Sequence, residues 1–196
     1  KDYINKCIVI NNFIDIDKIK KLSTKENIKR SKNKLLVFIG RLDDSSKKLS
    51  RQIKLVKEIN NIDLWIVGDG PDREKYEEEV KKYNLNNRIT FFGSKSNPYP
   101  YMKEADYIIL TSDYEGFPVT YLEALCLNKP IITTIPTSDE YLNIEEYAYI
   151  ISKDQSKMNK EVKKILESKE EKKTIDLEKI QERRMASLER LFNEVI

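Results

Sequence analysis

Two glutamates, Glu115 and Glu123, stand eight positions apart and are the residues of this chain best suited to chemistry. A strand-like stretch at residues 107–111 precedes them and an apolar helical pattern follows, so Glu115 falls in a strand-to-helix loop and Glu123 about two turns into the helix. The free amides and the dipole at a helix start favour phosphate, whereas an ionised carboxylate accepts hydrogen bonds from hydroxyls. The run therefore predicts a site for a ligand with both hydroxyls and phosphates.

Cations that could bind phosphate follow another strand-like run, at residues 35–39. Arg41 comes directly after Gly40, and Lys47 lies six positions further on. Arginine and lysine side chains form charge-assisted hydrogen bonds to phosphate oxygens, so this segment predicts a phosphate-binding loop. Lys48 is adjacent to Lys47, and either lysine could instead be a surface charge on the following helix.

The elements that must position these residues alternate between short apolar runs and amphipathic stretches of helical length. Such alternation is typical of a parallel sheet covered on both faces, so we predict an α/β, doubly wound, Rossmann-like fold with helices on both faces. The expected strands are residues 35–39, 63–67, 88–92, 107–110, 130–133 and 148–151. The expected helices are residues 48–60, 71–83, 99–104 and 117–127 and a long C-terminal helix over 177–195.

Glycine and polar clusters follow four of these strands. Carboxyl ends of parallel strands meet at one edge of the sheet, where ligands of open α/β sheets bind. Taken singly, each glycine could be a turn residue and each glutamate a solvated helix charge, but four clusters at one edge favour a binding crevice. The clusters are Gly40-Arg41, residues 68–71, Gly93-Ser94-Lys95 and residues 112–116.

Two of these segments resemble motifs of a known family. Glu-Gly-Phe-Pro at 115–118 with Glu-Ala-Leu at 123–125 resembles the Glu-x7-Glu signature of the retaining family 4, or group 1, glycosyltransferases. Gly40-Arg41-Leu42 with Lys47 resembles the family's Gly-Arg-Leu…Lys element, although Lys48 stands where the family usually has Gly. The resemblance spans residues 8–151 and implies the C-terminal, donor-binding domain of a two-Rossmann GT-B enzyme.

The resemblance also implies a role for each site residue. Glu115 would contact the transferred sugar, Arg41 and Lys47 would bind the donor phosphates, and these three would form the catalytic group. Glu123 would accept hydrogen bonds from the ribose hydroxyls, the loop at Ser94-Lys95 would lie against the base, and Pro118 would fit the first helical turn. The donor-binding residues would be Gly40, Ser94, Lys95, Gly116, Phe117, Pro118, Val119 and Glu123.

This reading predicts a retaining, hexosyl-type glycosyltransferase. Its donor would be a nucleoside-diphosphate sugar, UDP-linked by preference, and its acceptor a glycan or lipid-linked molecule in bacterial cell-surface polysaccharide synthesis. The acceptor site would lie on an N-terminal domain that this chain lacks, so we expect the chain alone to be inactive. The alternative is a catalytically inactive relative that stabilises a partner transferase; such proteins usually lose site acids or cations that are all present here.

Composition narrows the remaining choices. Charged residues of both signs make up 35% of the chain and the net charge is only +3, which argues against nucleic-acid binding. Histidine is absent, and neither Asp43-Asp44 nor Asp113 with Glu115 has a partner set for a metal, so we expect no metal and no cofactor. Two distant cysteines, Cys7 and Cys126, and no membrane-spanning stretch predict a cytoplasmic protein.

The chain ends define the expected domain organisation. Residues 1–34 resemble the segment that joins the two domains, and residues 35–196 would form the nucleotide-sugar-binding domain. The lysine-rich stretch 18–34 is expected to be a solvated connector, with peripheral contact to anionic lipid at the inner face of the membrane as the alternative. The C-terminal helix could pack on its own domain or cross back to the N-terminal one. The chain begins at Lys1, and we expect it to belong to a longer protein.

Overall fold

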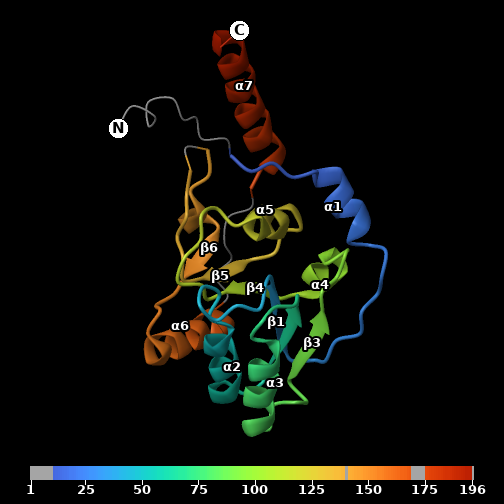
Figure 1. Cartoon of the computed structure of the whole chain (residues 1–196), viewed down its shortest axis with the longest axis vertical. Helices are drawn as coiled ribbons and strands as arrows, with labels where there is room; N and C mark the ends of the chain where they lie inside the picture. The colour runs from blue at the N-terminus through green and yellow to red at the C-terminus, as the bar shows by residue number, and fades with distance from the viewer. Residues whose placement is uncertain (1–10, 140, 169–174, 196) are drawn as a thin grey trace.

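The computed structural model describes residues 11–139, 141–168 and 175–195 and shows one parallel sheet between two layers of helices (Figure 1). The strand order is β3-β2-β1-β4-β5-β6, which confirms the doubly wound arrangement. Each strand begins and ends within one residue of its predicted bounds. The strands are β1 Lys34–Ile39, β2 Ile62–Val67, β3 Ile89–Gly93, β4 Tyr107–Leu110, β5 Ile131–Thr133 and β6 Ala148–Ile150.

The predicted helices are present, and two further helices were not predicted. The helix after β4 begins at Val119, two residues later than expected, and α6 is capped by Asp154, whose side chain accepts from the Lys157 amide. The helices are α1 Ile16–Leu22, α2 Leu49–Glu58, α3 Arg73–Lys82, α4 Tyr99–Glu104, α5 Val119–Cys126, α6 Gln155–Glu167 and α7 Leu177–Val195, with a 3₁₀ turn, η2, at Ile144–Glu146.

Strand side chains alternate between two cores, one on each face of the sheet. Leu36 and Phe38 point into the core that α2, α3 and α6 cover, and Leu35 and Val37 point into the core on the other face. Figure 1 shows α1, α4 and α5 on that second face. All four side chains are at most 1% exposed, so β1 is a central, fully covered strand.

The segment before β1 contributes to the fold more than the sequence predicted. Residues 1–34 were expected to be an interdomain connector, solvated over 18–34, yet Ile16 and Ile19 of α1 are buried in the core beside α5. The lysines of α1 remain exposed. The two isoleucines are three positions apart, which places them on one face of a short helix. The prediction relied on the high lysine content of the segment and did not use this spacing. Residues 1–10, including Cys7, lie outside the described residues.

The long C-terminal helix packs on its own domain along its first half. Leu177 and Ile180 are buried against the core beside α5, and Arg184 is 2% exposed. Phe192, two turns later, is 58% exposed, and Figure 1 shows the end of α7 projecting away from the sheet. Within the described residues, no helix combines the length and the hydrophobicity needed to cross a bilayer.

Candidate functional site

The site lies where the strand order reverses, between β1 and β4. These strands are neighbours in the sheet although two other strands separate them in sequence, and the chain leaves them in opposite directions across the sheet. In open α/β sheets ligands bind at such a reversal, in a crevice outside the carboxyl ends of the strands, and the loops after β1 and β4 lie there. The first loop carries Arg41 and Lys47, and the second carries Glu115.

Lys47 and Glu115 meet across this crevice although they are 68 positions apart. The Lys47 ammonium lies 2.6 Å from Oε1 of Glu115, and the Ser112 hydroxyl donates to the same oxygen at 2.6 Å. The Glu115 side chain is 9% exposed and the Lys47 side chain 25%. A carboxylate this buried needs a counter-charge, and the fold supplies one from a different loop.

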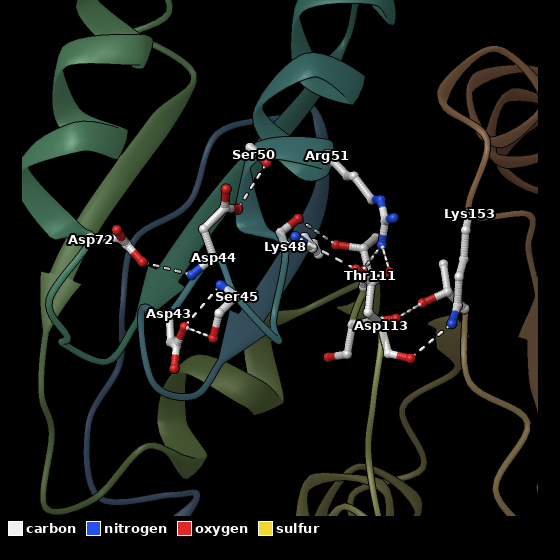
Figure 2. Close-up of polar contacts among 12 residues, drawn as sticks. Asp43, Asp44, Ser45, Lys48, Ser50, Arg51, Asp72, Thr111, Asp113 and Lys153 are labelled. Atoms are coloured by element: carbon white, nitrogen blue, oxygen red, sulfur yellow. Dashed lines mark hydrogen bonds and ion pairs between the residues drawn. The ribbon is translucent and has the colours of Figure 1, made fainter.

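The two loops are tied together on both sides of this ion pair. The Asp113 amide donates to the Ser46 carbonyl at 2.8 Å. Arg51 donates to the Thr111 carbonyl at 2.8 Å and to Oδ1 of Asp113 at 2.7 Å, and Figure 2 shows Asp113 between Arg51 and Lys153. Burial alone would raise the pKa of Asp113, but the Arg51 hydrogen bond and the surrounding cations hold that pKa below its usual value.

The backbone conformation at Lys48 directs the side chains of Lys47 and Lys48 to different acids. Lys48 precedes α2 with a φ of +52°, in the left-handed region where glycine is normally favoured. Its ammonium lies 3.6 Å from Asp113, whereas Lys47 contacts Glu115. Lys47 therefore contacts the glutamate loop, and Lys48 occupies the strained turn.

Asp44 anchors the other side of the β1–α2 loop. Its Oδ1 accepts from the Ser50 hydroxyl at 2.9 Å and from the Tyr76 hydroxyl at 3.0 Å, and its Oδ2 pairs with Lys75 (Figure 2 shows the Ser50 contact). Burial would raise the pKa of Asp44, but these hydrogen bonds bring it below the ordinary value. Asp44 thus fixes the loop. Among the described residues, no group of three or more metal-ligating acids, cysteines or histidines gathers anywhere.

A hollow of about 240 Å³ opens beside the Arg41 loop. It brings together four residues that the sequence placed at the site, from loops after β1 and β3: Gly40, Arg41, Ser94 and Lys95. Gly68 forms part of the floor, where a Cβ atom would lie 1.9 Å from the Gly40 carbonyl oxygen. Any side chain at Gly68 would therefore push the β1 and β2 loops apart.

Glu123 has a different environment from Glu115. It lies in the second turn of α5, nearer the helix start than predicted, and is half-buried. The Tyr99 hydroxyl at the start of α4 donates to its Oε1 at 3.0 Å. Burial raises the pKa of the Glu123 carboxyl above its ordinary value, and the Tyr99 hydrogen bond offsets part of that rise.

The loop before α5 corrects one prediction. Pro118 was expected in the first helical turn, but its ψ of +124° makes it the residue before the helix, and Val119 begins the helix. A Cβ at Gly116 would meet no atom within 4 Å, so open space faces that backbone. The Phe117 carbonyl accepts from the Asn12 side chain at 2.8 Å.

Several side chains that shape the site were not singled out from the sequence. Arg51 lies four positions after Lys47, a helical spacing that could have suggested a shared face, and Ser112 belonged to a cluster that was recognised. Tyr99 begins the predicted helix at residues 99–104 but was given no role in the site. Arg184 of α7 lies 5.6 Å from the centre of the Phe117 ring and pairs with Asp139, a contact between segments far apart in the chain.

Comparison with known proteins identifies the family. The model of the family "Glycosyl transferases group 1" matches residues 19–181. An uncharacterized glycosyltransferase of Methanocaldococcus jannaschii is 34% identical over 142 residues, which cover 68% of this chain and 35% of that protein. The lipopolysaccharide 1,6-galactosyltransferase of Salmonella typhimurium is 30% identical over 111 residues, or 54% of this chain and 31% of that enzyme.

A solved structure agrees with the fold. Anabaena HepE, crystallised in complex with UDP, superposes with a TM-score of 0.71 at 18% identity, over 93% of this chain and 57% of that one. At this identity the likeness shows the fold alone. The chain spans about a third of the length of the two curated relatives described above. It belongs to the group 1 glycosyltransferases and corresponds to the C-terminal, Rossmann-like half of their GT-B fold.

Proposed function

We propose that this domain binds the nucleoside-diphosphate sugar, UDP-linked, of a retaining hexosyltransferase. The acceptor would be a glycan or lipid-linked molecule of cell-surface polysaccharide synthesis. The observation that carries the proposal is the Lys47–Glu115 ion pair, 2.6 Å long, at the point where the strand order reverses. It places a cation and a carboxylate side by side where a phosphate and a sugar would meet.

The two members of the pair would exchange partners when the donor binds. The Lys47 ammonium would turn to the diphosphate, as Arg41 would from the rim of the neighbouring hollow. Glu115 would then accept hydrogen bonds from hydroxyls of the transferred sugar, with Ser112 still donating to it. Both cations would stabilise the diphosphate as the bond to the sugar breaks.

The rest of the donor would extend along the same edge of the sheet. The amides of Gly116, Phe117 and Val119 would face the phosphates at the start of α5. The base would lie against Ser94 and Lys95. The proposal assigns the ribose hydroxyls to Glu123, whose half-buried carboxylate can accept more hydrogen bonds than the single one from Tyr99.

The proposal includes a metal-independent site, since two cations and a helix start would share the diphosphate charge. It also places the protein in the cytoplasm, consistent with the buried free thiol of Cys126. The exposed lysines of residues 18–34 would contact anionic lipid. Transfer would require an N-terminal domain to hold the acceptor, so donor binding is the activity to measure on this chain.

Calorimetric titration with UDP tests the assignment. We expect wild type and Lys54→Ala, which removes an exposed lysine of α2, to bind equally. Lys47→Ala and Glu123→Ala should each weaken binding at least tenfold, because each loses hydrogen bonds to a charged group worth about 1.5–3 kcal/mol. Equal affinity in all four proteins would refute the site. Binding that disappears with EDTA would refute metal independence alone.

A further inference from the structure

A tyrosine and a glutamate from adjacent helices form a pair at the ribose end of the proposed site. Tyr99 is the first residue of α4, and its hydroxyl lies 3.0 Å from Oε1 of Glu123 on α5. Pro98, directly before Tyr99, lines the hollow that also contains Arg41 and Lys95. The backbone at the start of α4 therefore borders the hollow, and Tyr99 joins that backbone to Glu123 on α5.

The Glu123 carboxylate can accept further hydrogen bonds from a ligand. It is half-buried, and Tyr99 is the donor that the described part of the chain supplies to its side chain. The phenol is neutral, so the charge of Glu123 is not balanced as that of Glu115 is by Lys47. A partly buried carboxylate with one neutral donor is stabilised by any ligand that brings further hydroxyl donors.

We propose that Tyr99 is a positioning residue that holds the Glu123 carboxylate toward the two vicinal hydroxyls of a ribose, and that the pair selects ribonucleoside diphosphates over deoxy analogues. This inference rests on the proposed function. The Tyr99 hydroxyl donates to Oε1, which restricts the rotation of the carboxylate, and the proposal assigns the free acceptor capacity of both oxygens to the ligand. Each oxygen accepts more than one hydrogen bond, so a vicinal pair of hydroxyls can be bound together.

Tyr99 is suited to this role over the whole working pH range. Burial, and then the nearby charge of Glu123, raise the pKa of the Tyr99 phenol to about 12. The hydroxyl therefore keeps its proton and donates at neutral pH. A phenylalanine there would fill the same space between α4 and α5 and would remove only the donor, which makes Tyr99→Phe a clean test.

The experiment is a thermodynamic cycle that removes the Tyr99 hydroxyl from the protein and the ribose hydroxyls from the ligand, separately and together. UDP and 2′,3′-dideoxy-UDP are titrated calorimetrically into wild type, Tyr99→Phe and the control Tyr107→Phe, which removes a phenol at the start of β4, at the opposite end of the sheet. Tyr99→Phe should weaken UDP about tenfold, the effect of one hydrogen bond to a charged group. It should leave the affinity for the dideoxy analogue at the wild-type value, and Tyr107→Phe should change neither.

A second cycle guards against a general loss of structure. In a Glu123→Ala background, adding Tyr99→Phe should weaken UDP no further, because the carboxylate that it positions is gone. Equal losses for UDP and for the dideoxy analogue would overturn the proposal, since a merely structural tyrosine affects both. Unchanged affinity for both ligands in Tyr99→Phe would also overturn it. If Lys47→Ala weakens UDP while Tyr99→Phe does not, the donor site stands and only this inference fails.

Discussion

Glu115 and Glu123 are the same residue type on one short segment, yet the fold gives them opposite surroundings. Glu115 is 9% exposed and accepts from a lysine and a serine hydroxyl. Glu123 is half-buried and accepts from a neutral phenol. One carboxylate is charge-balanced inside the protein, and the other carries a raised pKa.

The difference follows from where the partners come from. Lys47 reaches Glu115 from the loop after β1, across the reversal of the sheet, and that loop is fixed by Arg51 and Asp44. Tyr99 reaches Glu123 from the neighbouring helix. The Lys47–Glu115 region thus stabilises the fold even without ligand. The carboxylate of the Tyr99–Glu123 region can still accept hydrogen bonds from a ligand, and its incomplete pairing lowers the stability of the fold. This contrast separates the two regions experimentally.

Lys47→Met should produce the largest effect. It removes a cation for the diphosphate and also leaves Glu115 buried beside Ser112 alone. We expect UDP to bind about 30-fold more weakly and the free energy of unfolding to fall by about 1–3 kcal/mol, the range for a buried charged group that loses its partner. Calorimetry and chemical denaturation, followed through the fluorescence of Trp65, measure the two quantities.

Lys48→Met is the matched comparison for that variant. Lys48 is adjacent in sequence but pairs with Asp113, which keeps Arg51 as a second partner. We expect its UDP affinity to stay near wild type. A Lys48 variant that loses as much affinity as Lys47→Met would contradict the separation of the two lysines.

Arg51→Met should have the next largest effect. Arg51 joins the two loops through the Thr111 carbonyl and the Asp113 carboxylate without facing the donor. We expect UDP to bind about fivefold more weakly, and expect little further loss when Arg51→Met is added to Lys47→Met, because coupled residues are not additive. Additive losses in this double-mutant cycle would show that Arg51 acts independently of Lys47. Lys160→Met, which replaces an exposed cation by methionine on α6, is the control.

The strands and the edge that carries the site could be predicted from the sequence. Buried parallel strands need continuous apolar runs, and β1 and β4 are such runs with glycine or polar residues directly after them. Convergence of the loops after β1 and β4 on one edge was predicted, whereas the strand order and the contact between Lys47 and Glu115 were not. The apolar runs and the strand–helix alternation were enough to predict the strands and this edge, because both follow from the course of the backbone.

The side-chain partners could not be predicted in the same way. The side chains that contact the two glutamates or their loops come from separate elements and meet only in particular rotamers, as Tyr99, Arg51 and Ser112 do. The hydrophobic periodicity of the sequence does not predict such contacts. α6 was missed although its apolar residues recur at helical spacing, because the lysines and glutamates between them made the stretch look like a solvated surface segment; these apolar residues are Met158, Val162, Ile165 and Leu166. The environment of Glu123, set by α4, likewise depends on packing between helices.

Changing pH should affect donor binding through Glu123. Because burial raises the pKa of Glu123, its carboxyl takes up a proton at a higher pH than an ordinary glutamate. Protonation removes an acceptor, so affinity for UDP-glucose, whose phosphates do not titrate there, should fall as pH drops through that raised pKa. Stability should change with the opposite sign: a carboxyl with a raised folded-state pKa favours the fold at low pH and loses that contribution as pH rises.

Glu123→Gln supplies the control for this pH profile. The variant keeps the shape and removes the charge, so it should bind UDP-glucose weakly at every pH and lose the acid dependence. It should also unfold at a higher denaturant concentration than wild type at pH 7. The absence of histidine leaves few other groups to titrate between pH 5 and 7. A profile that Glu123→Gln leaves unchanged would assign the titration elsewhere.

Ser112→Ala should produce the smallest effect, and it isolates the sugar end of the site. Ser112 is fully buried and its hydroxyl donates to Glu115 at 2.6 Å, while Lys47 stays in place to balance the charge. We expect the free energy of unfolding to fall by about 1 kcal/mol, a typical value for one hydrogen bond. Affinity for UDP-glucose should drop about threefold and affinity for UDP should not change, because the serine orients only the carboxylate assigned to the sugar. Equal losses for the two ligands, measured by calorimetry on the same preparation, would place Glu115 at the diphosphate instead and erase the division between the two carboxylates.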